Sequence, residues 1–452
     1  MYTISIGSDN MKYYCIGIKG TGMSTLAQIL NDLGHKVSGY DDCLDHKFTQ
    51  DGLEDRNIPI YYDGNHELDS DTIVTYSAAF SENHPEIQRV RALGLVVKKY
   101  NEIMGDIISM FDSIGVSGTH GKTTTSSLIR HILEADCGCN YFIGAGDGYA
   151  MKENDYFVVE SDEFNRQFTA YKPKYSVITN IEAEHLECYK DIDDIRDTFE
   201  IFANQTKKLV VANGDNEQVR KINYKTPVKF YGFDESNDVV IKNMQLLESG
   251  SVFDLYIDGE LFGHFDLPLF GKHMLLNALA VIAVCHYERL DAKEVSKSLK
   301  TFKGAERRFK ETFIGNNVIV DDYAHHPAEV KVTIKAARQK YPDKKIIAVF
   351  KAHTFSRVEE FSEEFASALN LADKAYVMDI NYDRENPLDY PGIDAYTIID
   401  KLDNGDYIEQ GMSDKLLDYD NAVILFMSSK EIYLLEEEYI KKLEERIKDT
   451  NN

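Results

Sequence analysis

The fold of this chain depends on the stretch Ile114-Gly-Val-Ser-Gly-Thr-His-Gly-Lys-Thr-Thr-Thr125. An apolar run leads into a glycine turn, and an apolar-periodic segment follows from Leu128 to Leu133. Such a strand, turn and helix start form a phosphate cradle, because glycine lets backbone amides approach phosphate oxygens at the positive end of the helix dipole. Lys122 supplies a mobile charge and the Thr123 hydroxyl can ligate Mg²⁺. The general pattern G-x-x-x-x-G-K-[ST] has glycine where Val116 stands, so a plain structural turn is the alternative to a nucleotide-binding loop.

Length and composition indicate a globular protein of several domains. At about 150 residues per domain, 452 residues suggest three. The sequence shows neither an apolar run of about 18 residues nor a signal peptide, and we expect a cytoplasmic protein without a membrane partner. The net charge of −26 also argues against a nucleic-acid partner, which would need a basic face. The six cysteines are scattered, and we expect free thiols because their spacing fits no zinc finger.

The N-terminal segment, 1–108, has the pattern of a Rossmann-like domain. A short strand from Tyr13 runs into Gly17-Ile-Lys-Gly-Thr-Gly22, a helix over Ser24–Leu33 follows, and a second strand ends in Asp41-Asp42. An acid about twenty residues after the glycines is where a ribose hydroxyl would bind. Lys19 replaces the central glycine of G-x-G-x-x-G, so a tight turn without a ligand is the alternative.

In the central segment, 109–311, acidic residues follow two predicted strands. The strand Tyr156–Glu160 runs into Asp162 and Glu163, and the strand Lys174–Asn180 is followed by two further glutamates and His185. The C-terminal ends of parallel strands beside a nucleotide loop are where Mg²⁺ and the reacting phosphate belong. Solvated strand ends are the alternative. Alternating residues over 251–269 predict hairpins at the flank of a mostly parallel sheet.

The C-terminal segment, 312–452, repeats the αβ alternation. A strand over Val318–Val320 runs into Asp321-Asp-Tyr-Ala-His-His-Pro327, and a helix is predicted over Ala328–Lys340. The next strand, Lys345–Phe350, runs into Lys351-Ala-His-Thr-Phe-Ser-Arg357. We therefore predict an α/β protein of three domains: Rossmann-like, P-loop ATPase-like and Rossmann-like.

Six motifs in the same order resemble the Mur ligase family over nearly the whole chain. They are the Gly17–Met23 loop, Tyr76–Ala79 with Asn83–Glu86, the Gly118–Thr125 loop, Thr179–His185, Arg307–Phe309 with Asp321–Pro327, and His353–Arg357. The resemblance implies an ATP-dependent amide ligase that uses Mg²⁺. It implies further that the lactyl carboxylate of UDP-N-acetylmuramate is activated as an acyl phosphate and then attacked by the amine of L-alanine.

The resemblance also assigns residues to each ligand. For ATP they are Gly118, Thr119, His120, Gly121, Lys122, Thr123, Thr124, Asn277, Arg308 and Asp322. For the UDP-sugar they are Gly17, Lys19, Gly20, Thr21, Gly22, Met23, Asp41, Asp42, Ser77 and Ala78. For the amino acid they are His326, His353 and Arg357, and for the metal they are Thr123, Glu160 and His185. The catalytic group is then Lys122, Glu160, His185, Arg308, His326 and Arg357.

Three departures from the family pattern concern substrate choice. Met274 stands where asparagine is usual, Lys351-Ala352 replaces Gln-Pro, and Met427-Ser-Ser-Lys-Glu-Ile432 lacks two glycines, which removes freedom for positive φ. A ligase adding another amino acid or a preformed peptide stays open, since one methyl group contributes only about 1–2 kcal/mol to selectivity. More remote alternatives are a dinucleotide-dependent oxidoreductase and a catalytically inactive relative. The sequence leaves the oligomeric state open between a monomer and a homodimer.

Overall fold

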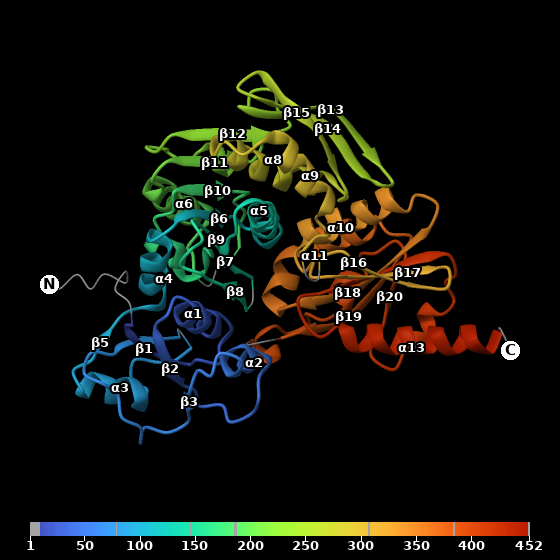
Figure 1. Ribbon diagram of the computed structural model, residues 1–452. Helices are drawn as coiled ribbons and strands as arrows, with labels where there is room; N and C mark the ends of the chain where they lie inside the picture. Colours follow the sequence, from blue (N-terminus) through green and yellow to red (C-terminus); the bar gives the residue numbers. More distant parts are fainter. Residues whose placement is uncertain are drawn as a thin grey trace. The chain divides into compact units, whose positions relative to one another are not determined.

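The structure is a computed structural model that describes residues 10–77, 79–144, 146–184, 188–305, 308–382 and 385–450. It contains three β-sheets with helices packed on them (Figure 1), and the predicted α/β class with three domains is confirmed. Chain contacts divide it into two compact units. The first comprises 1–242, 255–263 and 276–299, and the second comprises 243–254, 264–275 and 300–452. The boundaries at 108 and 311 stay predictions. Within the described ranges, no helix combines the length and the hydropathy needed to cross a membrane.

The N-terminal domain is a five-stranded sheet in the order β3-β2-β1-β4-β5, with parallel pairing throughout. Its strands are β1 (Lys12–Ile16), β2 (Lys36–Tyr40), β3 (Ile60–Tyr61), β4 (Ile73–Tyr76) and β5 (Val96–Val97). Its helices are α1 (Thr21–Asp32), α2 (Phe48–Glu54), α3 (Pro85–Ala92) and α4 (Tyr100–Ser109). The strand order reverses between β1 and β4, and such a switch point opens a crevice at the carboxyl ends of the strands. The glycine loop after β1 lies there.

The central sheet has ten strands in the order β15-β14-β13-β12-β11-β10-β6-β9-β7-β8. They are β6 (Asp112–Ser117), β7 (Asn140–Ile143), β8 (Asp147–Tyr149), β9 (Tyr156–Glu160), β10 (Tyr175–Ile178), β11 (Leu209–Asn213), β12 (Val228–Gly232), β13 (Val239–Leu247), β14 (Gly250–Ile257) and β15 (Glu260–Leu267). The helical segments are α5 (Lys122–Asp136), η1 (Phe164–Ala170), α6 (Ile192–Gln205), α7 (Glu217–Arg220), α8 (Lys272–Tyr287) and α9 (Ala292–Thr301). The β7–β8 hairpin, which the sequence pattern did not predict, packs against α1 of the N-terminal domain.

Strand β6 lies between β9 and β10 and is parallel to both. Val116 pairs with Glu160, and Ser117 pairs with Ile178. The loops that follow these three strands therefore leave the same edge of the sheet. This register brings the glycine loop next to both acidic clusters that the sequence separates by about 40 and 60 residues.

The opposite part of this sheet is fastened by Glu288, just beyond α8. Its carboxylate accepts hydrogen bonds from Lys174 (3.0 Å), Lys208 (3.0 Å) and the Tyr156 hydroxyl (2.9 Å). Burial raises the pKa of Glu288, but hydrogen bonds from Tyr175, the two lysines and Tyr156 outweigh it and hold the pKa at about 2. The ionised carboxylate therefore ties the end of α8 to β9 and to the residues just before β10 and β11.

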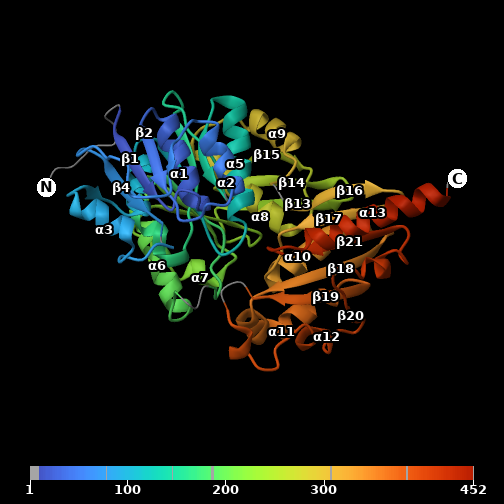
Figure 2. The same ribbon diagram turned by 90° about the horizontal axis from the view of Figure 1, so that it is seen from below.

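The C-terminal domain is a six-stranded sheet in the order β16-β17-β21-β18-β19-β20, parallel except for β16. Its strands are β16 (Lys310–Ile314), β17 (Asn317–Asp322), β18 (Lys345–His353), β19 (Lys374–Asn381), β20 (Gly405–Tyr407) and β21 (Ala422–Met427). Its helical segments are α10 (Pro327–Lys340), α11 (Phe355–Leu369), η2 (Pro387–Asp389), α12 (Tyr396–Ile399), η3 (Ser413–Leu416) and α13 (Tyr433–Thr450). Helices α10 and α11 lie on one face of the sheet and α13 lies on the other (Figure 1 and Figure 2). Each face buries its own apolar core.

Candidate active site

The loop between β6 and α5 has the backbone geometry of a phosphate cradle. Gly118 has φ of +136°, and a Cβ there would stand 2.0 Å from the Thr179 hydroxyl oxygen. Gly121, with φ of +84°, precedes α5 without a side-chain cap on its amides. Asn180 anchors the loop, since its carbonyl accepts from the amide of Thr119 (3.0 Å) and its side-chain oxygen from the amide of His120 (2.8 Å). The N-terminus of α5 thus begins in a braced turn that only glycine can form.

Lys122, in the first turn of α5, is held over this loop by a buried ion pair. Its Nζ lies 3.0 Å from both carboxylate oxygens of Glu163 and donates to the carbonyls of Gly118 (2.6 Å) and Thr119 (3.3 Å). Burial lowers the pKa of Lys122, but Glu163 and the acids around it outweigh this effect and raise the pKa above its ordinary value. The Glu163 side chain is only 3% exposed. The ammonium is therefore charged and fixed in place.

Thr123 and Glu160 form a second polar pair beside the lysine. The Thr123 hydroxyl donates to Oε1 of Glu160 (3.0 Å), and the amide of Gly144 donates to Oε2 (2.7 Å). Burial raises the pKa of Glu160, while the nearby Lys122 opposes that effect. A hydroxyl and a buried carboxylate are hard oxygen donors, and this donor set fits Mg²⁺. The third predicted metal ligand, His185, lies outside the described residues.

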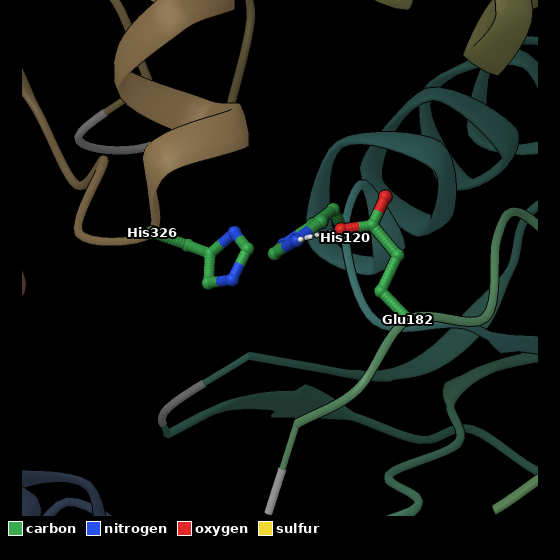
Figure 3. Close-up of side chains that lie close together, drawn as sticks. All are labelled: His120, Glu182 and His326. Atoms are coloured by element: carbon green, nitrogen blue, oxygen red, sulfur yellow. Dashed lines mark ion pairs between the residues drawn. The ribbon is translucent and has the colours of Figure 1, made fainter. Parts of the chain in front are cut away.

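His120 and Glu182 connect the loop to the segment after β10. Figure 3 shows the imidazole and the carboxylate facing each other. Their Nε2 and Oε2 atoms form an ion pair with a separation of 3.4 Å. The amide of Glu182 also donates to the hydroxyl of Thr119 (2.9 Å). His326, also labelled in Figure 3, stands at the start of α10 and belongs to the second unit.

Two other predicted nucleotide residues lie close to the loop inside the first unit. Asn277 of α8 is buried, and its Oδ1 would stand 2.8 Å from a Cβ at Gly121. Thr124 is buried in the first turn of α5. Close packing of α8 on the turn is therefore a second reason for glycine at 121.

In the N-terminal loop, Lys19 and Asp41 make internal contacts. The Lys19 side chain is buried, and its Nζ donates to the carbonyls of Cys43 (2.8 Å) and Asp45 (3.1 Å) beside the ring of Tyr62. The carboxylate of Asp41 accepts from the amides of Lys19 (2.9 Å) and Cys43 (3.0 Å). Both side chains thus join the glycine loop to the segment after β2.

The remaining predicted UDP-sugar residues surround the start of α1. A Cβ at Gly17 would meet Ser77 at 2.9 Å, and a Cβ at Gly22 would meet the hydroxyl of Tyr100 at 3.3 Å. Gly20 precedes the first turn of α1, which begins at Thr21 and buries Met23. Asp42 accepts from the hydroxyl of Tyr40 (2.7 Å) and lies 3.1 Å from the imidazole of His84. Ala78 lies outside the described residues.

In the second unit, Asp322 braces the loop after β17. Its buried carboxylate accepts from the amides of Phe309 (2.8 Å) and Ala324 (2.8 Å) and from the hydroxyl of Thr333 (3.3 Å). Burial raises the pKa of Asp322, and Arg308 opposes that effect. Asp322 thereby connects the segment that carries Arg308 to the start of α10.

The two histidines after β17 are ordered by a capping box. His326 is the N-cap of α10, and the carboxylate of Glu329 accepts from the amides of His325 (3.0 Å) and His326 (3.3 Å). The rings of His325 and His353 lie 6.2 Å apart. The structure thus brings the segment after β17 next to the end of β18, and Arg357 lies in the first turn of α11.

Sequence reasoning did not predict several of the supporting residues. Glu163 was one of three acids behind a strand, and the pattern gave no partner for it. Asn180 was part of a motif without a stated role. Glu329 carries a signal that was available, because a glutamate three residues after an N-cap is typical of a capping box.

Comparisons with known proteins identify the relatives of this chain. The chain matches three family models: Mur ligase family, catalytic domain, over 12–112; Mur ligase middle domain over 116–285; and Mur ligase, glutamate ligase domain, over 307–429. Its structure is similar to UDP-N-acetylmuramate-alanine ligase MurC from Thermotoga maritima, with a TM-score of 0.77 and 25% identity over 97% of this chain and 100% of that one. It is also similar in fold to a murein peptide ligase from Psychrobacter arcticus, with a TM-score of 0.65 and 19% identity over 96% and 99% of the two chains. MurF ligase from Thermotoga maritima in complex with ADP gives a TM-score of 0.65 and 19% identity over 91% and 96%.

Proposed function

Because this chain belongs to the Mur ligase family and is an ATP-dependent ligase of peptidoglycan synthesis, we propose that it joins L-alanine to the lactyl carboxylate of UDP-N-acetylmuramate. The similarity to the alanine ligase over the full length of both chains supports this choice. Family membership also removes the oxidoreductase alternative, since a ligase of this family has a use for both glycine loops.

The observation that carries the proposal is the charged Lys122 fixed at the N-terminus of α5. Transfer of a phosphoryl group to a carboxylate brings two anions together, so catalysis depends on positioning and charge neutralisation more than on a base. Uncapped amides at the helix start and the ammonium together bind the phosphates of ATP. Glu163 fixes the position of the ammonium over the loop, since both of its carboxylate oxygens accept from Nζ of Lys122.

Thr123 and Glu160 would hold Mg²⁺, with His185 as the further proposed ligand. The ion would supply screening between the phosphate oxygens and the substrate carboxylate. Glu160 is oriented for this by the amide of Gly144 and the hydroxyl of Thr123.

For the UDP-sugar, we assign direct binding to the backbone amides of Thr21–Met23 at the start of α1, because the amides of residues 17–20 donate to acceptors within the domain. Lys19 and Asp41 would act indirectly, by fixing the glycine loop to the segment after β2. In the second unit, His326, His353 and Arg357 are the proposed amino-acid residues, and Arg308 the proposed nucleotide contact. Asp322 would position Arg308 through the amide of Phe309.

The departure at Met427-Ser-Ser-Lys-Glu-Ile432 does not strain the backbone. The two usual glycines would stand at Ser428 and Lys430, and neither residue has a positive φ, so glycine is not required at either position. The Ser428 hydroxyl donates to the carbonyl of Lys351 (3.0 Å) and accepts from the amide of Lys430 (3.1 Å). The serine thus ties β21 to β18, and its presence is compatible with an alanine ligase.

The test is phosphate release with ATP, Mg²⁺, UDP-N-acetylmuramate and a panel of L-alanine, glycine, L-serine and a muramyl-type tripeptide. We expect the highest kcat/KM with L-alanine. Highest turnover with the tripeptide and feeble turnover with alanine would overturn the proposal in favour of a peptide ligase. Product mass must increase by one alanine residue, which excludes simple ATP hydrolysis.

A further inference from the structure

The N-terminus of α11 is closed by a carboxylate from a distant segment. Oε2 of Glu385 accepts from the backbone amides of Phe355 (2.6 Å) and Ser356 (3.2 Å). Its Oε1 accepts from the hydroxyl of Ser356 and lies 3.5 Å from that of Tyr390. The ring of Tyr390 stacks on Phe355 at 5.9 Å. A carboxylate favours this place because the helix amides point outward and the helix dipole is positive there.

The backbone that Glu385 holds has an unfavourable conformation. Thr354, between β18 and α11, has φ of +70° and ψ of +142°. A β-branched residue rarely adopts such a φ, and it persists only where the surroundings enforce it. Two contacts enforce it here: the amide of Thr354 donates to the carbonyl of Asn381 (2.7 Å), and Glu385 binds the next two amides.

This strained turn separates the two predicted amino-acid residues of the segment. His353 ends β18, and Arg357 lies in the first turn of α11, so the three intervening residues set the position of one relative to the other. Glu385 contacts two of those three residues. Glu385 follows β19 in the chain. Asn381, the last residue of β19, contacts the same turn, because its carbonyl accepts from the amide of Thr354.

We propose that Glu385 is a positioning residue for the amino-acid substrate, acting by fixing the Thr354–Ser356 turn and thereby the placement of His353 and Arg357. This inference rests on the proposed function, in which these two side chains take the amino acid. Glu385 itself would not touch the substrate, because both of its oxygens are used by the turn.

The experiment compares Glu385→Ala, Glu385→Gln and the control Glu360→Ala in the full chain. Glu360 is an exposed glutamate of the same helix outside this network, so its removal has the same charge change. Steady-state phosphate release gives KM for each substrate and kcat, and hydrogen exchange followed by mass spectrometry reports the amides of Phe355 and Ser356.

We expect Glu385→Ala to raise KM for the amino acid about tenfold, which corresponds to about 1.4 kcal/mol. KM for ATP and the UDP-sugar should stay within twofold of the wild type, and exchange at the two amides should accelerate. Glu385→Gln should recover part of the loss, since its carbonyl oxygen can still accept from both amides. Glu360→Ala should behave as the wild type.

Three results would overturn the inference. A lower KM for the amino acid in Glu385→Ala would mean that Glu385 competes with the substrate for the helix amides. A parallel rise in all three KM values, with no recovery in Glu385→Gln, would mean a purely structural role. Unchanged kinetics and exchange would mean that the contact is unimportant. If the wild type preferred another amino acid or a peptide, the same comparison with that substrate would test Glu385 independently of the alanine proposal.

Discussion

A double-mutant cycle on Lys122 and Glu163 tests the core of the site. The perturbations are Lys122→Met, Glu163→Gln and the combination. Unit charges 3.0 Å apart attract by about 5.5 kcal/mol at an effective dielectric constant of about 20. Burial of both groups offsets much of this attraction, whereas removal of one partner from a buried pair typically costs about 3–5 kcal/mol.

We therefore expect Glu163→Gln to destabilise the protein by about 3 kcal/mol, because the buried ammonium then keeps only carbonyl partners. The double variant should be less destabilised than the sum of the single variants by about 2 kcal/mol or more, since contacting charges couple. Phosphate release should fall by about 100-fold or more in Lys122→Met, and by about 10-fold or more in Glu163→Gln, where the ammonium is present but poorly aimed.

The assay is urea unfolding of the wild type and the three variants, together with kcat for phosphate release. The control is Glu217→Gln, which removes the partner of Lys221 in an exposed pair on α7 and should leave stability and kcat unchanged. Additive single-variant effects, or a wild-type kcat in Glu163→Gln, would refute the conclusion that the ion pair places the lysine.

Three further predictions concern stability and the metal. Glu288→Gln should lower the free energy of unfolding by about 3 kcal/mol at pH 7. The folded pKa of about 2 lies below the ordinary 4.5, so this contribution is complete above pH 4.5 and is lost as the pH falls towards 2. In urea unfolding, the difference in stability between the wild type and Glu288→Gln should be smaller at pH 3 than at pH 7. Gly118→Ala should destabilise the protein by about 3 kcal/mol or more, because alanine would have a positive φ and a steric clash there. Gly94→Ala should cost only about 1–2 kcal/mol, because Gly94 has a positive φ but a Cβ there would have no atom within 4 Å. Equal losses of Tm in the two variants would contradict this prediction. Glu160→Gln should raise the Mg²⁺ concentration for half-maximal phosphate release about tenfold or more, and a wild-type Mg²⁺ response would count against this ligand.

Much of the architecture follows from local pattern. Apolar runs that end in glycine turns predicted the strand–loop–helix units around Gly17 and Gly118, and Pro327 marked the start of α10. These signals are local because backbone conformation and periodicity act over a few residues. The β7–β8 hairpin escaped prediction, because its strands of four and three residues are too short to show a period.

The sequence by itself determined the αβ alternation and the order of the motifs, because both are written in neighbouring residues. Only the tertiary structure decided which side chains form ion pairs and hydrogen bonds with one another. Glu163 meets Lys122 across 41 positions, Glu385 meets Ser356 across 29, and Lys19 turns inward to two carbonyls. Such partners depend on the order and register of strands in a sheet, and that order is set by packing of distant segments that no local pattern encodes.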